Sequence, residues 1–105
     1  MKIMFYYKQG ELTPEIKDYA EKKIKAATKY FANIIEARLE LDENTKVASG
    51  DKYRAEIHLK VPNGLIYADT RGETLKAAID LVLPKAERQL KDYKEKLQDN
   101  KRKGK

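Results

Sequence analysis

Basic side chains recur along the last third of the sequence at a spacing that could bind phosphate groups. They include Lys85, Arg88, Lys91, Lys94 and Lys96. The segment 72–105 holds ten basic and six acidic residues, and this difference supplies most of the chain's formal net charge of +6. Because ammonium and guanidinium groups in such a row can neutralise phosphates, the row favours an anionic partner, with nucleic acid the first candidate.

A solvated helix surface is the alternative explanation for these charges, because Glu87, Asp92 and Glu95 lie among them. The basic excess survives that neutralisation. Lys23 is a further candidate, since on an ideal helix it projects within the apolar arc of its own segment, near Tyr19. It either extends past the sheet edge or lies in a groove beside the last helix and faces a phosphate.

Side chains for catalysis or metal binding are scarce. The chain has one histidine, His58, and no cysteine, so it offers no credible zinc set and no catalytic triad. Its glycines lie in no phosphate-loop or dinucleotide spacing. We therefore expect a binding protein that is not an enzyme, with no metal site, no cofactor and no small-molecule substrate.

Length and composition favour one folded domain. With 105 residues, of which 41% are apolar, the chain can bury a core. The absence of cysteine suits a reducing compartment. The first residues are too few and too polar for a signal peptide, and no apolar run approaches the roughly 18 residues of a membrane span. We expect a cytoplasmic protein without membrane contact.

Alternating and helical patterns predict four strands and two helices. The strands are expected at 2–8, 34–43, 52–61 and 65–71, and the helices at 14–31 and from 72 onward. Thr13-Pro14 is typical of a helix start, and Pro62-Asn63-Gly64 predicts a hairpin turn. Pro84 lies inside the last helix and predicts a kink. We expect a single domain over 1–97 and a basic, disordered tail over 98–105.

The order β-α-β-β-β-α predicts an α+β fold with two helices packed on one face of a four-stranded sheet. The first helix should return the chain to a parallel strand. The other sheet face should be a solvated, mixed surface that carries Arg38, Glu40, Arg54, Glu56, His58 and Lys60. Most of the seven tyrosines fall on core-facing positions, Tyr30 among them, so stacking on nucleic-acid bases is not expected.

The sequence resembles the ribosome hibernation promoting factor family, which includes the ribosome-associated inhibitor A proteins, once called sigma-54 modulation proteins. The resemblance rests on the element order, on the Pro62-Asn63-Gly64 turn and on several ordered motifs over about residues 1–97. These motifs are Thr13-Pro14-Glu15-Ile16, Lys23, Tyr30-Phe31, Ala77-Ala78-Ile79-Asp80, and Glu87-Arg88-Gln89-Leu90 followed by Lys94 and Lys96.

The resemblance implies a fold similar to double-stranded RNA-binding domains and binding in the small-subunit channel of 30S and 70S ribosomes, where mRNA and tRNAs sit. Idle ribosomes would thereby be silenced, as in stress and stationary phase. By position, the implied rRNA contacts are Lys23, Arg88, Lys94 and Lys96, with Lys85 and Lys91 as neighbours.

Three departures from the family pattern bear on this expectation. Asp92 stands where a basic residue is common, and Pro84 is unexpected in the last helix. The chain also lacks the C-terminal domain of long members, so we expect a short form. Pairing of ribosomes would then need an auxiliary dimerising factor or would not occur.

Two other functions fit the residues. A free-standing double-stranded RNA-binding protein is one, although such domains usually carry a lysine cluster at the start of the last helix, where this chain has Gly72-Glu73-Thr74-Leu75-Lys76. A regulatory protein–protein interaction module is the other. Its affinity would change little with salt, whereas phosphate contacts release counterions and weaken steeply as salt rises.

Overall fold

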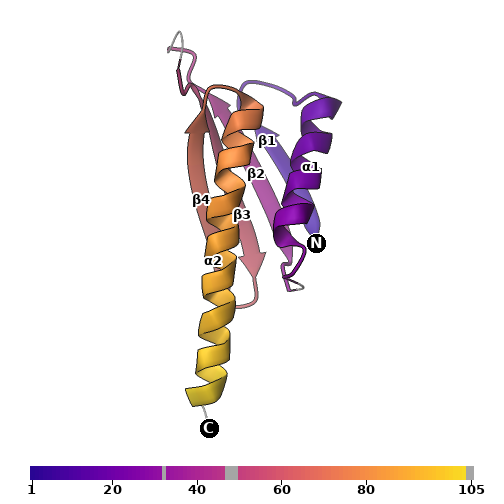
Figure 1. The fold of residues 1–105 in the computed structure, drawn as a ribbon. Coiled ribbons are helices and arrows are strands. Elements are labelled where there is room, and N and C mark those ends of the chain that lie inside the picture. Colours follow the sequence, from indigo (N-terminus) through magenta and orange to yellow (C-terminus); the bar gives the residue numbers. More distant parts are fainter. Residues whose placement is uncertain (32, 47–49, 104–105) are drawn as a thin grey trace.

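The four strands and two helices follow one another in the predicted order in the computed structural model (Figure 1). The elements are β1 (Lys2–Tyr7), α1 (Pro14–Thr28), β2 (Glu36–Glu43), β3 (Tyr53–Val61), β4 (Gly64–Gly72) and α2 (Leu75–Lys103). The structure describes the backbone of residues 1–31, 33–46 and 50–103, and the side chains of these ranges up to residue 96. The predicted α+β class is confirmed.

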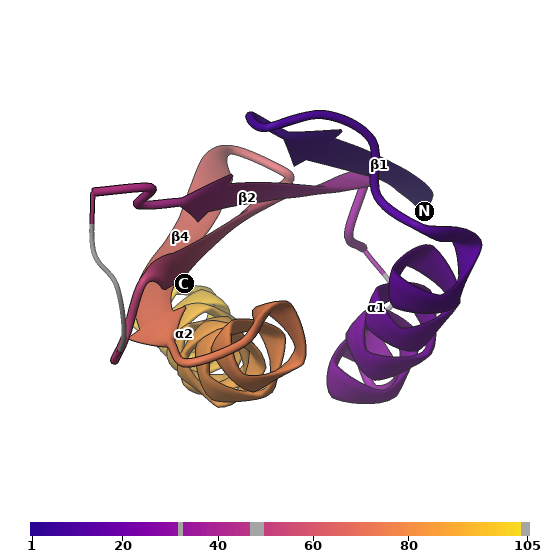
Figure 2. The ribbon, with the colours of Figure 1, turned by 90° about the horizontal axis from the view of Figure 1, so that it is seen from above.

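The sheet has the strand order β1-β2-β3-β4, with β1 parallel to β2 and the other neighbours antiparallel. A parallel pair needs a crossover connection, and α1 provides it. Both helices cover the same face of the sheet, as the view from above shows (Figure 2). The prediction of two helices on one face of a four-stranded sheet is therefore confirmed.

The core lies between this sheet face and the helices. Alternate residues of the two central strands are fully or almost fully buried, namely Ala37, Leu39 and Leu41 of β2 and Ala55, Ile57, Leu59 and Val61 of β3. They meet Ala20 and Ile24 of α1 and the stripe Ala78, Ile79, Val82, Ala86 and Leu90 of α2. The strand period of two and the helix period of 3.6 put these residues on matching faces.

The helix-start motif and the turn motif adopt the local structures that the sequence predicts. The Thr13 hydroxyl accepts a hydrogen bond from the Ile16 N–H at 3.2 Å, which caps α1, and Pro14 takes the first helical position. Val61 pairs with Gly64 across the two-residue turn. Asn63 adopts a φ of 64° there, a conformation that asparagine tolerates better than most residues.

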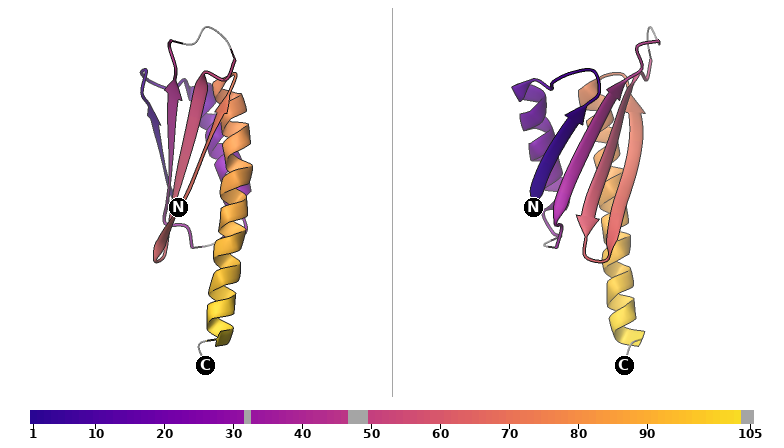
Figure 3. Two further views of the ribbon diagram at one scale, coloured as in Figure 1. Left: turned by 90° about the vertical axis from the view of Figure 1, so that its left-hand side faces the viewer. Right: turned by 180° about the vertical axis from the view of Figure 1, so that it is seen from behind.

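Helix α2 runs through Pro84 as one continuous helix and projects beyond the end of the sheet (Figure 3). Pro84 is exposed, so the carbonyl that loses its helical partner lies on the solvated side. The helix continues to Lys103, although the sequence predicts a disordered tail over 98–105. The side chains of that tail, like residues 47–49 of the loop before β3, lie outside the described residues, and the division into domain and tail stays a prediction.

The ends of three elements differ from the sequence prediction by two residues or more, and the other differences are of one residue. Helix α1 ends at Thr28 rather than at 31, β2 begins at Glu36 rather than at 34, and α2 begins at Leu75 rather than at 72. Beyond a helix end, helical spacing no longer decides which way a side chain points. Tyr30, which the sequence predicts to face the core, is accordingly 74% exposed.

No helix in the described part of the chain is both long enough and apolar enough to span a lipid bilayer.

The chain passes from β4 into α2 through a close contact at Gly72. The Thr74 hydroxyl caps the helix by accepting a hydrogen bond from the Ala77 N–H at 3.0 Å. A Cβ atom on Gly72 would lie 2.6 Å from the Ala78 nitrogen and 2.9 Å from the Ala77 carbonyl carbon. A side chain at residue 72 would therefore push α2 away from the sheet.

Replacing Gly72 with alanine should lower the free energy of unfolding by about 1–3 kcal/mol, the usual cost of overpacking. Urea denaturation measures this change. Gly64→Ala is the matched control, because its Cβ would meet only the Val61 side chain at 3.6 Å, and it should change stability by less than about 1 kcal/mol. Equal losses for the two variants would contradict the proposed close contact.

Candidate nucleic-acid interface

A set of polar contacts joins α1 to α2 along the groove between them. The Tyr19 hydroxyl donates a hydrogen bond to Asp80 Oδ1 at 2.5 Å, and Lys23 Nζ lies 3.8 Å from the same oxygen. Nearer the start of α2, Lys76 Nζ donates to Glu15 Oε1 at 2.9 Å. These contacts fix the two helices relative to each other above the apolar core.

The structure places Lys23 in this groove, one of the two positions that the sequence allows. Its side chain is 49% exposed, and its ammonium group lies 5.5 Å from the centre of the Tyr19 ring. A shallow hollow of about 270 Å³ lies beside it, bordered by Asp80, Pro84 and Glu87. Lys23 is therefore accessible to a phosphate, but it already has a carboxylate neighbour with which a phosphate would compete.

The predicted basic residues of α2 are all exposed. Lys94 Nζ lies 5.9 Å from the centre of the Phe31 ring, which places Lys94 on the flank of α2 that faces the end of α1. Lys85 Nζ lies on the opposite flank, 3.3 Å from the Asp69 carbonyl oxygen of β4. Among the side chains that the structure describes, none forms an ion pair with Arg88, Lys91 or Lys96.

These cations spread over the exposed side of α2, opposite its buried stripe, rather than forming one flat face. Residues two apart on a helix point about 200° apart, so Lys94 and Lys96 lie on nearly opposite sides. The charges are accessible because they point away from the apolar stripe that α2 buries on the sheet. The helix itself continues past the end of the sheet (Figure 1). A partner that contacts all of these cations must wrap around the exposed side of α2.

Lys85 also has a structural role that the sequence does not indicate. β4 is an edge strand, and two side chains of α2 donate to its free carbonyls: Gln89 Nε2 to Tyr67 at 2.6 Å and Lys85 Nζ to Asp69 at 3.3 Å. Such contacts cover groups that could otherwise pair with another strand. The Lys85 ammonium is thus less available to a partner than its exposure suggests.

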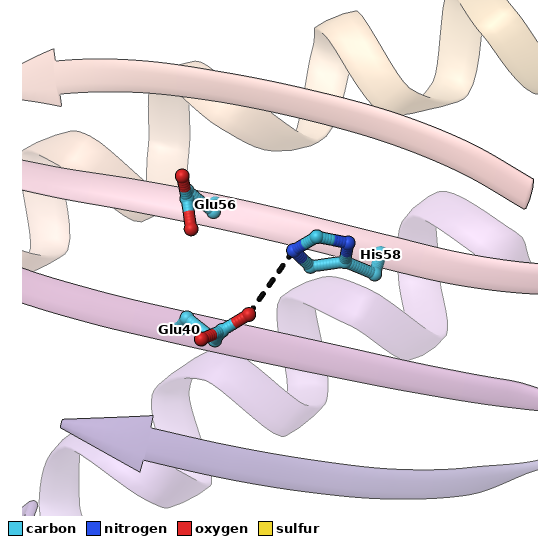
Figure 4. A group of neighbouring side chains, drawn as sticks. All are labelled: Glu40, Glu56 and His58. Carbon is cyan, nitrogen blue, oxygen red and sulfur yellow. Dashed lines mark ion pairs between the residues drawn. The ribbon is translucent and has the colours of Figure 1, made fainter.

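The open face of the sheet carries charges that are paired with one another. Glu40, Glu56 and His58 lie close together on β2 and β3, with potential ligand atoms within 4.8 Å (Figure 4). Glu40 Oε2 is 3.1 Å from His58 Nε2 and 3.4 Å from Arg38 Nε. Arg54 Nη1 is 2.6 Å from Glu56 Oε1, and Arg54 also donates to Asp69.

Because two guanidinium groups already neutralise these carboxylates, we interpret the cluster as an ion-pair network and not as a metal site. The hydrogen bond to Asp69 raises the pKa of Arg54 further above its ordinary value. The predicted mixed polar surface on this face is confirmed, and its internal pairing leaves little free charge to attract a partner.

Comparison with known proteins identifies the family. A model of the family described as Sigma 54 modulation protein / S30EA ribosomal protein matches residues 3–98. The chain belongs to this family. The predicted resemblance is therefore confirmed.

Relatives within the family cover nearly all of this chain. The Ribosome hibernation promotion factor of Picosynechococcus sp. is 36% identical over 99 residues, which are 91% of this chain and 50% of that protein. The protein of the same name from Bacillus subtilis is 29% identical over 83% of this chain and 45% of its own length. The chain thus spans about half the length of the curated relatives it matches.

Two solved structures share the fold. The N-terminal domain of Thermus thermophilus Protein Y is 31% identical, with a TM-score of 0.74 over 89% of this chain and 99% of that domain. A ribosomal subunit interface protein from Coxiella burnetii has a TM-score of 0.79 at 22% identity over 90% of this chain and 98% of that protein, a likeness of fold alone.

The sequence prediction did not include Asp80 among the residues of the site. Asp80 lies on α2 but contacts Tyr19 and Lys23 of α1, about sixty residues earlier in the chain. No local sequence pattern predicts a contact between residues so far apart in the chain. The Asp80 hydrogen bond is also the main reason why the pKa of Tyr19 is raised above its ordinary value near 10.

Replacing Asp80 with alanine should return the pKa of Tyr19 toward its ordinary value, because the acceptor that stabilises the neutral phenol is lost. NMR titration of the tyrosine ring carbons measures this change. A raised pKa means that the bond stabilises the fold fully below pH ~10 and that this contribution disappears as the pH rises through the folded-state pKa.

Tyr67 provides the internal control in the same titration. Its pKa is raised chiefly by burial and by the hydrogen bond to Glu56, on the opposite face of the sheet. It should titrate identically in the wild type and in Asp80→Ala. An unchanged Tyr19 pKa would mean that the contact between the helices does not persist in solution.

Proposed function

We propose that this chain binds the ribosome and silences it while it is idle, as a binding protein that catalyses no reaction. The observation that carries the proposal is the row of exposed cations along α2, of which Arg88, Lys91, Lys94 and Lys96 form no ion pair with any side chain that the structure describes. It is supported by membership of the family and by relatives that are named ribosome hibernation promotion factors. Such a role places the protein in the cytoplasm, during stress or stationary phase.

The site on the ribosome, in this proposal, is small-subunit rRNA in the channel for mRNA and tRNAs. A channel lined by RNA presents phosphates on several sides, which suits a helix with cations spread over its whole exposed side. Arg88, Lys91, Lys94 and Lys96 would contact phosphates from α2, and Lys23 from the adjoining groove. Lys85 would contribute less, because it also donates to the edge strand.

An RNA partner is favoured over a protein partner by the distribution of charge. The open sheet face, which could serve a protein, has its charges paired internally. The cations without a described ionic partner instead lie on α2, where phosphates would replace their water. Pairing of two silenced ribosomes, in this proposal, either needs an auxiliary dimerising factor or does not occur.

Sedimentation of the protein with purified ribosomal particles tests the proposal directly. We expect it to migrate with 30S and 70S particles in sucrose gradients and to dissociate as salt is raised. Absence from both particles, in low salt as well as physiological salt, would rule out ribosome binding. Equal affinity for a plain RNA duplex would instead favour a general double-stranded RNA binder.

Removing single charges should weaken ribosome binding and reduce its salt dependence. For Arg88→Ala, Lys94→Ala and Lys96→Ala, the slope of log affinity against log salt should fall by roughly 0.7–0.9 each, the increment for one phosphate. Arg88→Lys should restore only part of the affinity, because a guanidinium can bridge two phosphate oxygens. Affinity is measured over a salt series by filter binding or sedimentation.

Lys60→Ala is the matched control, since it removes an equally exposed charge from the open sheet face. It should change neither the affinity nor the slope appreciably, and all variants should melt within a few degrees of the wild type. A loss for Lys60→Ala as large as that for Arg88→Ala would place the binding face on the sheet.

A further inference from the structure

An exposed aromatic side chain stands at the end of α1, where the sequence predicts a buried one. Tyr30 is 74% exposed, the highest value among the exposed large hydrophobic side chains that the structure describes. Burying such a ring against a partner would remove a large apolar area from water. Its position beside α2 makes it more than an isolated surface tyrosine.

Tyr30 borders a small apolar hollow of about 220 Å³ between the end of α1 and the side of α2. Buried Val61 and Leu90 form its base, and the partly buried rings of Phe31 and Tyr93 form its walls. The Tyr93 hydroxyl donates to the Pro62 carbonyl at 2.7 Å, which anchors that wall to the β3–β4 turn. The hollow is therefore built largely from fixed parts of the fold.

Two lysines hold their charges over the rings of this hollow. Lys94 Nζ lies 5.9 Å from the centre of the Phe31 ring, and Lys29 Nζ lies 5.3 Å from the centre of the Tyr30 ring. Lys94 also belongs to the basic surface around α2. The hollow thus adjoins the row of cations to which we assign the phosphates.

We propose that this hollow binds one unpaired nucleobase of the bound RNA, stacked against Tyr30, while Lys94 and Lys29 contact the phosphates on either side of it. Aromatic faces stack on bases of any sequence, and neighbouring cations hold the backbone. This inference rests on the proposed function and names what part of the RNA the end of α1 recognises.

Size and charge favour a base over other occupants. The hollow is smaller than the roughly 300–1,000 Å³ of pockets that enclose drug-sized ligands, so it suits a single planar ring system. A lysine-rimmed apolar hollow would repel basic side chains of a partner protein. It would accept the combination of an apolar ring and adjacent negative charge, which a nucleotide offers.

Substitution of Tyr30 separates stacking from charge neutralisation. Tyr30→Ala should weaken binding to the 30S particle by roughly 5- to 150-fold, the range for loss of one stacked base. The salt slope should stay at the wild-type value, because no charge is removed, whereas Lys94→Ala should lower it. Tyr30→Phe should retain near-wild-type affinity, because it keeps the ring.

Tyr6→Ala is the matched control, since Tyr6 is also a half-exposed tyrosine (52%) but lies on β1, away from the hollow. It should bind like the wild type. Irradiation of the wild-type complex at 254 nm, followed by mass spectrometry, locates the contact directly. We expect a nucleotide adduct on Tyr30, Phe31 or Tyr93.

The outcomes distinguish this inference from the proposed function. If the wild type does not bind ribosomes, the proposed function and the nucleobase site are both overturned. If it binds but Tyr30→Ala binds equally well, or if Tyr30→Ala and Tyr6→Ala lose affinity alike, the nucleobase site alone is overturned. Crosslinks from the hollow to a ribosomal protein rather than to rRNA would overturn it as well, and would identify a protein side chain as the occupant.

Discussion

The burial of one apolar stripe of α2 on the sheet is the interaction on which the rest of this structure depends. Ala78, Ile79, Val82, Ala86 and Leu90 are almost completely buried against the central strands. Each larger member contributes about 1.5–3 kcal/mol relative to exposure. This contact fixes the axis of α2, and with it the side of the helix on which Arg88, Lys91, Lys94 and Lys96 are exposed. Gly72 permits it, since only a residue without a side chain lets the start of α2 approach so closely.

Charge is divided between two regions with different physical roles. On the open sheet face, Arg38 and Arg54 form ion pairs with carboxylates on the same or the neighbouring strand, so these charges largely neutralise one another. On the exposed side of α2, Arg88, Lys91 and Lys96 have no described ionic partner. Electrostatic attraction to a polyanion therefore acts mainly along α2. A net charge of +6 alone would not reveal this separation.

The groove between the helices holds both a stabilising contact, between Tyr19 and Asp80, and an accessible cation, Lys23. Asp80 accepts the Tyr19 hydroxyl and lies near the Lys23 ammonium, so it helps to hold α1 against α2 while lowering the local positive charge. A phosphate that reaches Lys23 must compete with this carboxylate. In the proposed function, a contact of Lys23 with a phosphate would consequently be weaker than those on α2. The same helix pair forms the hollow beside Tyr30, where aromatic surface rather than charge is exposed.

The sequence by itself determined the element order, the two-layer packing, the family and the basic character of the last helix. The element order and packing follow from apolar residues that recur with the strand period of two or the helix period of 3.6, and from the Thr13-Pro14 and Pro62-Asn63-Gly64 motifs. These are local patterns, and the basic character follows from composition. Only the tertiary structure decided which of the predicted lysines have polar partners within the described part of the chain. Lys85 donates to β4 and Lys23 adjoins Asp80 because strands and helices distant in sequence lie side by side. It also decided that Tyr30 is exposed, because α1 ends at Thr28 and helical spacing no longer applies beyond it. Contacts over long separations, and the residue at which a helix ends, depend on what the rest of the chain packs against them, and no short pattern encodes that.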